Sequence, residues 1–241
     1  MNWREKAQEH ALAEHPREAC GLVVVYKGRE IYWPCRNLAE GDEHFLIDPQ
    51  DWVQAEDAGA VVAVVHSHPN YAAEPSEPDL VACEASGLPW RIVSTPSLVW
   101  RAVEPSGYEA PLEGREFRHG VTDCYSLIRD WYKRHKGIEL PDFERRQEWW
   151  LKGEDLYLDN FGAAGFVDVT GQAPQEGDVM LFQFEGAPVP HHAGVYLSDD
   201  TLLHHLQGRL SSRDAWSGAF QQTLVKVLRH AGNSTVRGAG A

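Results

Sequence analysis

Residues 61–79 have the sequence VVAVVHSHPNYAAEPSEPD, and this stretch decides how the first half of the chain is organised. Its first five residues are apolar and mostly β-branched, which predicts a buried β-strand. His66 and His68 follow, two residues apart, so both side chains lie on one face. After a polar segment, Ser76 opens a predicted helix with Asp79 in its first turn. The stretch therefore predicts a strand, a loop and a helix that bring two imidazoles and one carboxylate together.

Two imidazoles and one carboxylate can bind zinc, and three protein ligands leave the fourth position of a catalytic zinc open. A plainer alternative also exists for each part of the stretch. Ser76 and Asp79 have the spacing of an N-terminal capping box, which is common at helix starts and implies no chemistry. A His-x-His pair at a strand end is more often an exposed surface feature than a ligand pair. Each part alone is therefore weak evidence for a metal site.

The complete spacing is more informative than its parts. It reads His, one residue, His, seven residues, Ser, two residues, Asp, with Glu18 upstream in the segment HPREACGLVV. This pattern resembles the JAMM (MPN-plus) zinc peptidases. The resemblance implies that His66, His68 and Asp79 bind Zn²⁺. It also implies that Glu18 is the general acid/base and that Ser76 assists the tetrahedral intermediate.

The composition indicates a folded protein without a basic surface. The chain has 241 residues, 43% of them hydrophobic, and a formal net charge of −14. It has no basic cluster, which argues against nucleic acid as a substrate. No apolar run approaches the length of a membrane span. The charged start, MNWREKAQEHALAEHP, predicts a helix and no secretory signal. The four cysteines are irregularly spaced, so neither a disulfide framework nor a sulfur zinc site is expected.

The first domain, which we place at residues 1–106, is expected to be an α/β domain with a mixed sheet and flanking helices. Its predicted strands are short, apolar and β-branched, at residues 22–26, 30–34, 61–65, 91–94 and 99–103, with an edge strand at 44–47. Helices are predicted at residues 2–14, after Asp48 and from Ser76 onward. Residues 104–111 are polar and rich in Pro and Gly, which is typical of a linker.

A second pattern begins after this linker, and we assign residues 112–231 to a second domain and 232–241 to a flexible tail. Asp123 caps a predicted helix that has one apolar face and ends at Gly137. Cys124 therefore lies in the first turn, where the backbone N–H groups and the helix dipole favour a thiolate and lower the pKa. Without further evidence, a cysteine at this position is more often a packed side chain.

Two later segments, HHAGVYL and TLLHHL, predict a β-hairpin over residues 198–200. A catalytic cysteine needs an imidazole as base, and the imidazole needs a partner that fixes its tautomer. A three-residue turn would place His192 and His204 on one face, whereas a two-residue turn would pair His192 with His205. The sequence leaves both registers open.

A cysteine at a helix start, a GDV strand, the HAGVYL strand and a polar residue twelve positions after the first His resemble the NlpC-type papain-like cysteine peptidases. The resemblance implies an α+β domain in which Cys124 is the nucleophile, His192 the base and His204 the orienting residue. These enzymes commonly have a Tyr shortly before the cysteine, near the oxyanion site, and this chain has none there. The Cys124 N–H is an available oxyanion donor. The aromatic, acidic segment 138–174 is either core or a wall of the substrate site.

The two domains in this order resemble a family of tail-tip assembly proteins from lambda-like tailed phages. The resemblance implies a hydrolase with two sites, a zinc metallopeptidase and a cysteine endopeptidase, acting in tail assembly or cell-wall penetration. Peptidoglycan stem peptide is the implied substrate of the cysteine site, and other phage tail-tip proteins are the implied partners. Assembly in the host cytoplasm and incorporation into the virion tail tip would require no signal peptide.

Two other functions are compatible with the sequence. The chain could be a structural tail-assembly protein in which one or both sites are inactive. It could also be a cytosolic JAMM-type isopeptidase that uses the zinc site alone, although the appended cysteine domain argues against this. The sequence does not identify the substrate of the zinc site.

Overall fold

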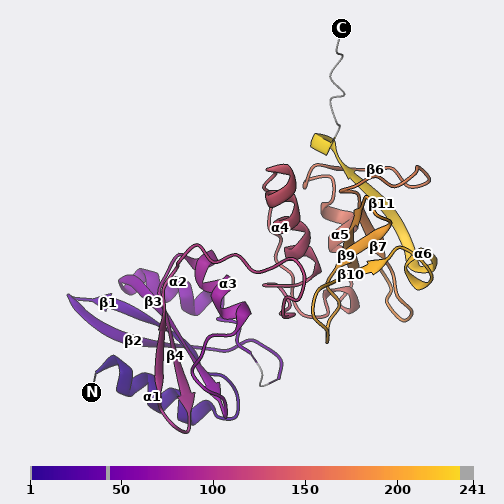
Figure 1. Cartoon of the computed structure of the whole chain (residues 1–241). Coiled ribbons are helices and arrows are strands. Elements are labelled where there is room, and N and C mark those ends of the chain that lie inside the picture. The colour runs from indigo at the N-terminus through magenta and orange to yellow at the C-terminus, as the bar shows by residue number, and fades with distance from the viewer. Residues whose placement is uncertain (1, 42–43, 234–241) are drawn as a thin grey trace. The chain divides into compact units, whose positions relative to one another are not determined.

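The computed structural model describes residues 2–41 and 44–233 (Figure 1). The chain divides into two compact units, Met1–Glu109 and Ala110–Ala241. Each unit has its own mixture of helices and strands and its own hydrophobic core. Of the expected tail, residues 234–241 lie outside the described part. Within the described residues, no helix is long and apolar enough to cross a membrane.

The first unit has a mixed sheet, as the sequence predicted, with the strand order β2-β1-β3-β4-β5. The strands are β1 (Cys20–Tyr26), β2 (Arg29–Cys35), β3 (Ala60–Pro69), β4 (Trp90–Thr95) and β5 (Trp100–Val103). The helices are α1 (Trp3–Glu14), α2 (Pro49–Ala58) and α3 (Glu77–Ser86). Strands β3 and β4 run parallel, and the other neighbours are antiparallel.

Local sequence signals account for the ends of these elements. Asn2, Asp48 and Ser76 are the N-caps of α1, α2 and α3, and each side chain accepts a hydrogen bond from a backbone amide of the first turn. Lys27 and Gly28 both have positive φ angles, 50° and 76°, which suits the tight turn between β1 and β2.

The edge strand predicted at residues 44–47 is wrong. Among the described residues of this segment, a single bridge joins Ile47 to Asn37. The Asn37 side chain accepts hydrogen bonds from the backbone amides of Ala39 and Leu46, at 2.9 and 3.0 Å. Two backbone hydrogen bonds flank the bridge, from the Leu38 amide to the Leu46 carbonyl at 2.8 Å and from the Asp48 amide to the Arg36 carbonyl at 3.1 Å. The pairing stops at this one bridge, and the Asn37 side chain takes the Leu46 amide that a longer ladder would use.

The alternation of side chains along β3 places the candidate ligands on one face of the first sheet. One face shares a hydrophobic core with α2 and α3, and the other face packs against α1 (Figure 1). Val64 belongs to the first core and Val65 to the second. Because side chains alternate, His66 and His68 continue the row of Val64. Both histidines therefore face the side of the sheet that α2 and α3 cover.

The second unit has an antiparallel sheet with the strand order β10-β9-β8-β7-β11-β6. Its strands are β6 (Phe166–Asp168), β7 (Val179–Phe182), β8 (His192–Leu197), β9 (Thr201–His204), β10 (Ser212–Ala215) and β11 (Leu224–His230). Its helices are α4 (Cys124–Lys136), α5 (Leu156–Asn160) and α6 (Ala219–Thr223), with 3₁₀ turns η1 (Trp149–Leu151) and η2 (Ala231–Asn233).

Helix α4 has the caps and the apolar face that the sequence predicted. The Asp123 side chain accepts a hydrogen bond from the Ser126 amide, and Gly137 ends the helix in the left-handed conformation. The buried residues on its inner face, together with residues of β7, β8 and β9, form the main core of the unit: Leu127, Ile128, Trp131 and Tyr132. Cys124 is thereby held at the first position of a well-anchored helix.

Candidate metal centre and candidate cysteine site

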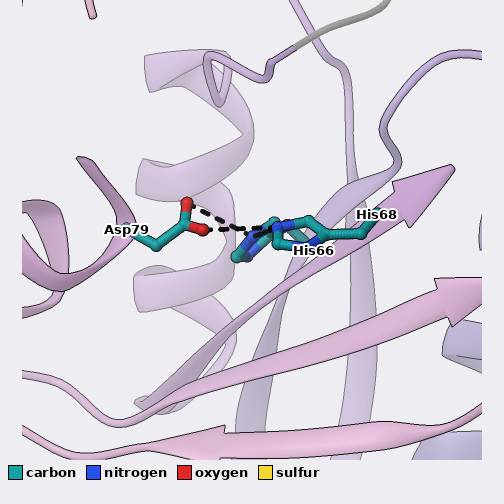
Figure 2. A group of neighbouring side chains, drawn as sticks. All are labelled: His66, His68 and Asp79. Atoms are coloured by element: carbon teal, nitrogen blue, oxygen red, sulfur yellow. Dashed lines mark hydrogen bonds and ion pairs between the residues drawn. The ribbon is translucent and has the colours of Figure 1, made fainter. Parts of the chain in front are cut away.

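His66, His68 and Asp79 lie together where β3 ends and α3 begins, and Figure 2 shows their polar ends directed towards one another. The Nε2 atoms of His66 and His68 are 3.0 Å apart. The carboxylate of Asp79 approaches both rings, with Oδ1 3.4 Å from His66 Nε2 and Oδ2 3.3 Å from His68 Nε2. Three potential ligand atoms therefore surround a common centre.

This donor set fits zinc. Ligand atoms about 2.0–2.1 Å from a tetrahedral zinc lie about 3.3–3.4 Å from each other. The three observed separations, 3.0 to 3.4 Å, are close to that value. His66 and Asp79 are only 1% and 4% exposed, so the ligands are shielded from water. Within residues 2–41 and 44–233, no second trio of such side chains converges in this way.

Neighbouring groups hold the ligands in this arrangement. His68 Nδ1 lies 2.9 Å from the carbonyl oxygen of Ala72, which accepts its N–H and leaves Nε2 with a lone pair for a metal. The Phe45 ring stacks on His66, with ring centroids 4.7 Å apart. Backbone and side-chain contacts at the start of α3 fix Asp79. The fold thus holds the three candidate ligand side chains in this arrangement by itself.

The capping box at the start of α3 is present, and it coexists with the candidate metal centre. The Ser76 amide donates to Asp79 Oδ2 at 2.8 Å, and the Asp79 amide donates to Ser76 Oγ at 3.2 Å. These bonds orient the Asp79 carboxylate towards the imidazoles. The Ser76 oxygen is the acceptor in this pair, so its O–H can still donate a hydrogen bond.

The electrostatics of the first site favour a cation. Burial opposes ionisation of Asp79, but the His66 and His68 rings and Ser76 outweigh it, and the pKa of the Asp79 carboxyl is lowered. Burial also disfavours protonation of His68, yet Asp79, the Ala72 carbonyl and Glu18 together raise its pKa. Two carboxylates thus act on the ring of His68, and a divalent cation would be stabilised among them.

Glu18 lies just before β1, beside the end of β3. Cys20 pairs with His66. Two hydrogen bonds extend this pairing, from the Ser67 amide to the Ala19 carbonyl at 3.0 Å and from the Ala19 amide to Ser67 Oγ at 2.8 Å. Because Glu18 is two residues from Cys20, it shares the face of His66. Glu18 is only 7% exposed, so a buried carboxylate borders the candidate ligands.

In the second unit, Cys124 occupies the first turn of α4 and faces two donor groups. Its Sγ lies 3.1 Å from the hydroxyl of Tyr157. The backbone amide of Ala193 also interacts with the thiol. Ala193 directly follows His192, which is 4% exposed at the start of β8. Helix α4 and strand β8 therefore bring the cysteine and the candidate base to the same place.

Strand pairing decides between the two hairpin registers. Leu197 pairs with Thr201, so residues 198–200 form a three-residue turn. His192 and His204 consequently lie on one face, and His192 Nε2 is 3.0 Å from His204 Nδ1. The alternative pairing of His192 with the neighbouring histidine does not occur.

His205 lies on the other face of β9 and has a different environment. Its ring meets Phe117 edge-on, with centroids 5.0 Å apart, and the residue is 0% exposed. Among the described residues, neither ring nitrogen makes a hydrogen bond of normal length and angle, although backbone groups of Thr122 and Arg209 lie close enough to act on the ring. Burial lowers the pKa of His205 to about 4, and the nearby Arg115 adds to this effect. His205 is therefore a neutral histidine of the protein interior.

Asp214, which no sequence pattern singles out, extends the hydrogen-bonded series beyond His204. His204 Nε2 lies 3.0 Å from Asp214 Oδ2. Ser212 pairs with His204 across β9 and β10, so Asp214, two residues further on, shares the same face. The SRDA segment has no apolar alternation that would predict a strand, and only its register against β9 identifies Asp214 as a neighbour of His204.

The sequence reasoning also missed Tyr157, which lies on α5, far from Cys124 in the chain. The segment 138–174 provides both core and a part of the site, since Trp149 is 2% exposed and Tyr157 contacts the thiol. The Tyr157 ring also lines a mainly apolar pocket with about 500 Å³ of empty space, partly open to solvent. Burial raises the pKa of Tyr157 well above its ordinary value, so the phenol remains a hydrogen-bond donor.

The expectation that the helix start lowers the pKa of Cys124 is wrong. Burial raises the pKa of the thiol to about 11, and the neighbouring Asp123 carboxylate adds to the rise. Asp123 already occupies the helix start, where it accepts a hydrogen bond from the Ser126 amide at 2.9 Å. The negative charge of Asp123 therefore offsets the helix dipole that would otherwise favour a thiolate.

The candidate base is also uncharged at rest. Burial lowers the pKa of His192 well below its ordinary value, and the nearby histidine rings act in the same direction. With the Cys124 pKa near 11, both the thiol and the imidazole are neutral at pH 7. The resting site is thus a neutral pair, whereas the position of Cys124 at the helix start had suggested a thiolate.

Comparison with known proteins finds a matching family for each half of the chain. Residues 2–106 match the family of prokaryotic homologs of the JAB domain, and residues 114–229 match the NlpC/P60 family. Tail tip assembly protein K of Escherichia phage N15 is 44% identical over 224 residues, covering 92% of this chain and 91% of that protein. Tail tip assembly protein K of Escherichia phage lambda is 44% identical over 184 residues, covering 76% and 89%.

Among solved structures, a JAB1/MPN domain protein from Archaeoglobus fulgidus is 25% identical over a match that covers 45% of this chain and 87% of that protein, with a TM-score of 0.30. The match to the phage N15 protein extends over nearly the whole length of this chain and therefore includes both of its domains. The chain belongs to the tail tip assembly protein K family, with an N-terminal JAB domain and a C-terminal NlpC/P60 domain.

Proposed function

We propose that the chain is a phage tail-tip hydrolase with two peptidase sites. The first unit is a zinc (iso)peptidase, and the second is a cysteine endopeptidase that cleaves peptidoglycan stem peptides in tail assembly or cell-wall penetration. The observation that carries the proposal is the 3.0 Å contact between His192 Nε2 and His204 Nδ1 beside Cys124. A cysteine nucleophile needs a base that a partner orients, and this contact supplies the partner.

At the cysteine site, proton transfer accompanies the attack, because both groups are neutral at rest. Cys124 Sγ attacks the amide carbonyl while His192 accepts the thiol proton, and His192 then protonates the leaving amine. Water, activated by His192, hydrolyses the thioester and regenerates the thiol. The Tyr157 hydroxyl and the Cys124 amide are the donors that we assign to the oxyanion. Tyr157 thus takes the place of the tyrosine that is missing before the cysteine.

In the first unit, His66, His68 and Asp79 would hold zinc. Zinc supplies Lewis-acid polarisation of a carbonyl and increases the acidity of water. We assign to Glu18 the removal of a proton from the attacking water and its return to the leaving amine. The Ser76 hydroxyl donates a hydrogen bond to the developing oxyanion. The substrate class is a peptide or isopeptide bond.

The proposed setting is the tail tip of the virion, reached by assembly in the host cytoplasm. Other tail-tip proteins are the expected partners, because the chain belongs to a tail-tip assembly family. Nucleic acid is not among the proposed ligands, since the net charge is −14 and no basic cluster is present.

Phage particles that carry single substitutions test this function against a purely structural role. Cys124→Ala should assemble normally but fail to infect cells with an intact wall, because the nucleophile is gone. Glu18→Ala should produce a different defect, because it affects the other site. Cys83→Ala and Glu9→Ala serve as matched controls outside both sites. Normal infection by both site variants would contradict catalysis and support a scaffold.

A further inference from the structure

We propose that Asp214 is a fourth member of the cysteine site, a positioning residue that fixes the tautomers of His204 and His192. The proposal rests on the proposed peptidase function, because it concerns the base of the same reaction. Asp214 does not touch the reacting atoms. It acts through two histidine rings.

The contacts form one continuous series across three neighbouring strands. His192 on β8, His204 on β9 and Asp214 on β10 are joined by two contacts of 3.0 Å each. The His204 side chain is 0% exposed and that of Asp214 is 29% exposed. The series therefore runs from the protein interior to the outer strand of the sheet.

A histidine as the third member is ambiguous, because either ring nitrogen can carry the proton. An ionised carboxylate can only accept hydrogen bonds, so Asp214 requires the proton of His204 to be on Nε2. Nδ1 of His204 is then a lone-pair acceptor and takes the Nε2–H of His192. Nδ1 of His192 is left without a proton. This tautomer leaves Nδ1 with a lone pair that can accept a proton, which is the role that the proposed function gives His192 towards Cys124.

The opposite arrangement would keep the same contact between the rings. If His204 carried its proton on Nδ1, it would donate to His192 Nε2. His192 would then carry its own proton on Nδ1 and could not accept one there. The packing of the two rings does not distinguish these arrangements. The carboxylate of Asp214 does.

A neighbouring cation keeps this carboxylate ionised. Arg209 lies 3.2 Å from Asp214 Oδ2 and 3.3 Å from Oδ1. Burial acts to raise the pKa of Asp214, but His204 and Arg209 lower it overall. Arg209 also donates to Ser212 Oγ at 2.6 Å, which anchors its guanidinium beside β10.

A matched control is available at the opposite edge of the same sheet. Asp168 on β6 pairs with Lys226 at 2.6 Å, and its side chain is 37% exposed. It resembles Asp214 in exposure and in its cationic partner, but no histidine relay adjoins it. If Asp214 only anchored an edge strand by an ion pair, Asp168→Ala and Asp214→Ala would have similar effects.

The first test measures the tautomers directly, in the full-length protein with ¹⁵N-labelled histidine. Ring ¹⁵N chemical shifts should identify both His192 and His204 as Nε2–H tautomers. Asp214→Ala should shift them towards Nδ1–H, Asp214→Glu should preserve them, and Asp168→Ala should leave them unchanged. Wild-type Nδ1–H tautomers, or unchanged tautomers in Asp214→Ala, would overturn the proposal. This test does not depend on any hydrolytic activity.

The second test measures coupling with a purified stem peptide as substrate. An Asn at position 204 could accept the His192 N–H through its own carbonyl oxygen, without Asp214. In the wild-type background, Asp214→Ala should lower kcat at least about tenfold. For comparison, loss of the residue that fixes the histidine tautomer in a serine protease lowers kcat about 10⁴-fold. Asp214→Ala should lower kcat less than about twofold in the His204→Asn background. Equal losses in both backgrounds would indicate a merely structural role. If the wild type cleaves no stem peptide, the proposed function fails, and the tautomer measurement still decides the role of Asp214.

Discussion

The two candidate sites differ in how their residues are distributed along the chain. The ligands of the first site all lie within residues 66–79, on one strand and the helix that follows it. The second site draws on α4, α5, β8, β9 and β10, from Cys124 to Asp214. Local spacing alone therefore outlines the first site, whereas only the strand register and the packing of α5 assemble the second.

The sites also differ in the way they handle charge. The first brings carboxylates to two imidazoles and suits a cation, and the pKa of Asp79 is lowered. The second keeps its candidate nucleophile and base neutral, with the pKa of Cys124 raised to about 11. The first site thus suits a bound ion, whereas in the proposed mechanism the second develops charge only during the reaction. The contrast implies that each site can be removed without disturbing the other.

The largest expected effect is a crossed loss of function between the two sites. In the full-length protein, Cys124→Ala should reduce stem-peptide cleavage at least about 10³-fold, because the nucleophile is lost. It should retain about one zinc per chain. His68→Ala should lose the zinc and keep cleavage within about twofold. Elemental analysis and chromatography of the digested peptides measure the two properties.

Two further results would sharpen this separation. Glu18→Ala should keep the zinc, because Glu18 is not among the converging ligand atoms. A chelator should leave stem-peptide cleavage intact. Loss of cleavage in His68→Ala or in the chelated protein would show that the sites depend on each other, against the comparison drawn above.

The next effect concerns the phenol beside the thiol. Tyr157→Phe should lower kcat for stem peptide about 10²-fold, the scale of losing one oxyanion donor. KM should change little, because the hydroxyl acts mainly on the charge that develops in the transition state. Tyr108→Phe removes a hydroxyl that contacts Glu77 in the first unit and is the matched control. Undiminished turnover in Tyr157→Phe would remove this residue from the oxyanion site.

A smaller effect should appear in the reactivity of the thiol itself. Because the pKa of Cys124 is about 11, its alkylation rate should rise about tenfold per pH unit between pH 6 and pH 9. Brief iodoacetamide treatment with peptide mapping measures the rate at each cysteine. Cys124 should still react before the other three cysteines, which are all buried. A rate independent of pH in this range would reveal a thiolate already formed at pH 6.

The smallest effect on turnover is expected for His205, although stability should respond. Its folded pKa of about 4 lies below the ordinary value of about 6.5, so the unfolded chain binds the proton first as the pH falls. Neutral His205 therefore makes its full contribution to the free energy of unfolding above pH 6.5. Up to about 3 kcal/mol of this contribution is lost as the pH falls from 6.5 to 4.

His205→Leu keeps an apolar side chain at this buried position and removes the titrating group. Urea unfolding at pH 7 and pH 4.5 should therefore show a weaker acid destabilisation than in the wild type, while kcat stays within about twofold. His204→Ala should reduce turnover far more. The reverse ranking of the two histidines would contradict the role assigned to His204.

The elements of the fold were predictable where short-range rules apply. A continuous apolar, β-branched run located β3, and capping residues located the starts of α3 and α4, because both signals depend on neighbouring residues alone. The strand predicted at residues 44–47 is reduced to a single bridge, because the Asn37 side chain takes the Leu46 amide that a longer ladder would use. A single-residue substitute of this kind leaves no periodic signal in the sequence.

The candidate sites were predictable to different depths for the same reason. The close spacing in the sequence determines most of the relative positions of the His66, His68 and Asp79 side chains. Tyr157 and Asp214 carried no such signal, since their proximity depends on how α5 packs and how β10 pairs. The pKa of Cys124 was expected in the wrong direction, because the helix-start rule takes no account of burial or of the adjacent carboxylate.

The raised pKa of Cys124 has a consequence for the durability of a particle outside a cell. Peroxides attack thiolates, and oxidation beyond the sulfenic acid is generally irreversible. A thiol with a pKa of about 11 is ionised in only about one molecule in 10⁴ at pH 7. A free virion has no reducing enzymes and cannot replace a damaged protein. The neutral Cys124 thiol is therefore oxidised more slowly than a thiolate, and under the proposed function it would still be intact when the tail tip meets a cell wall.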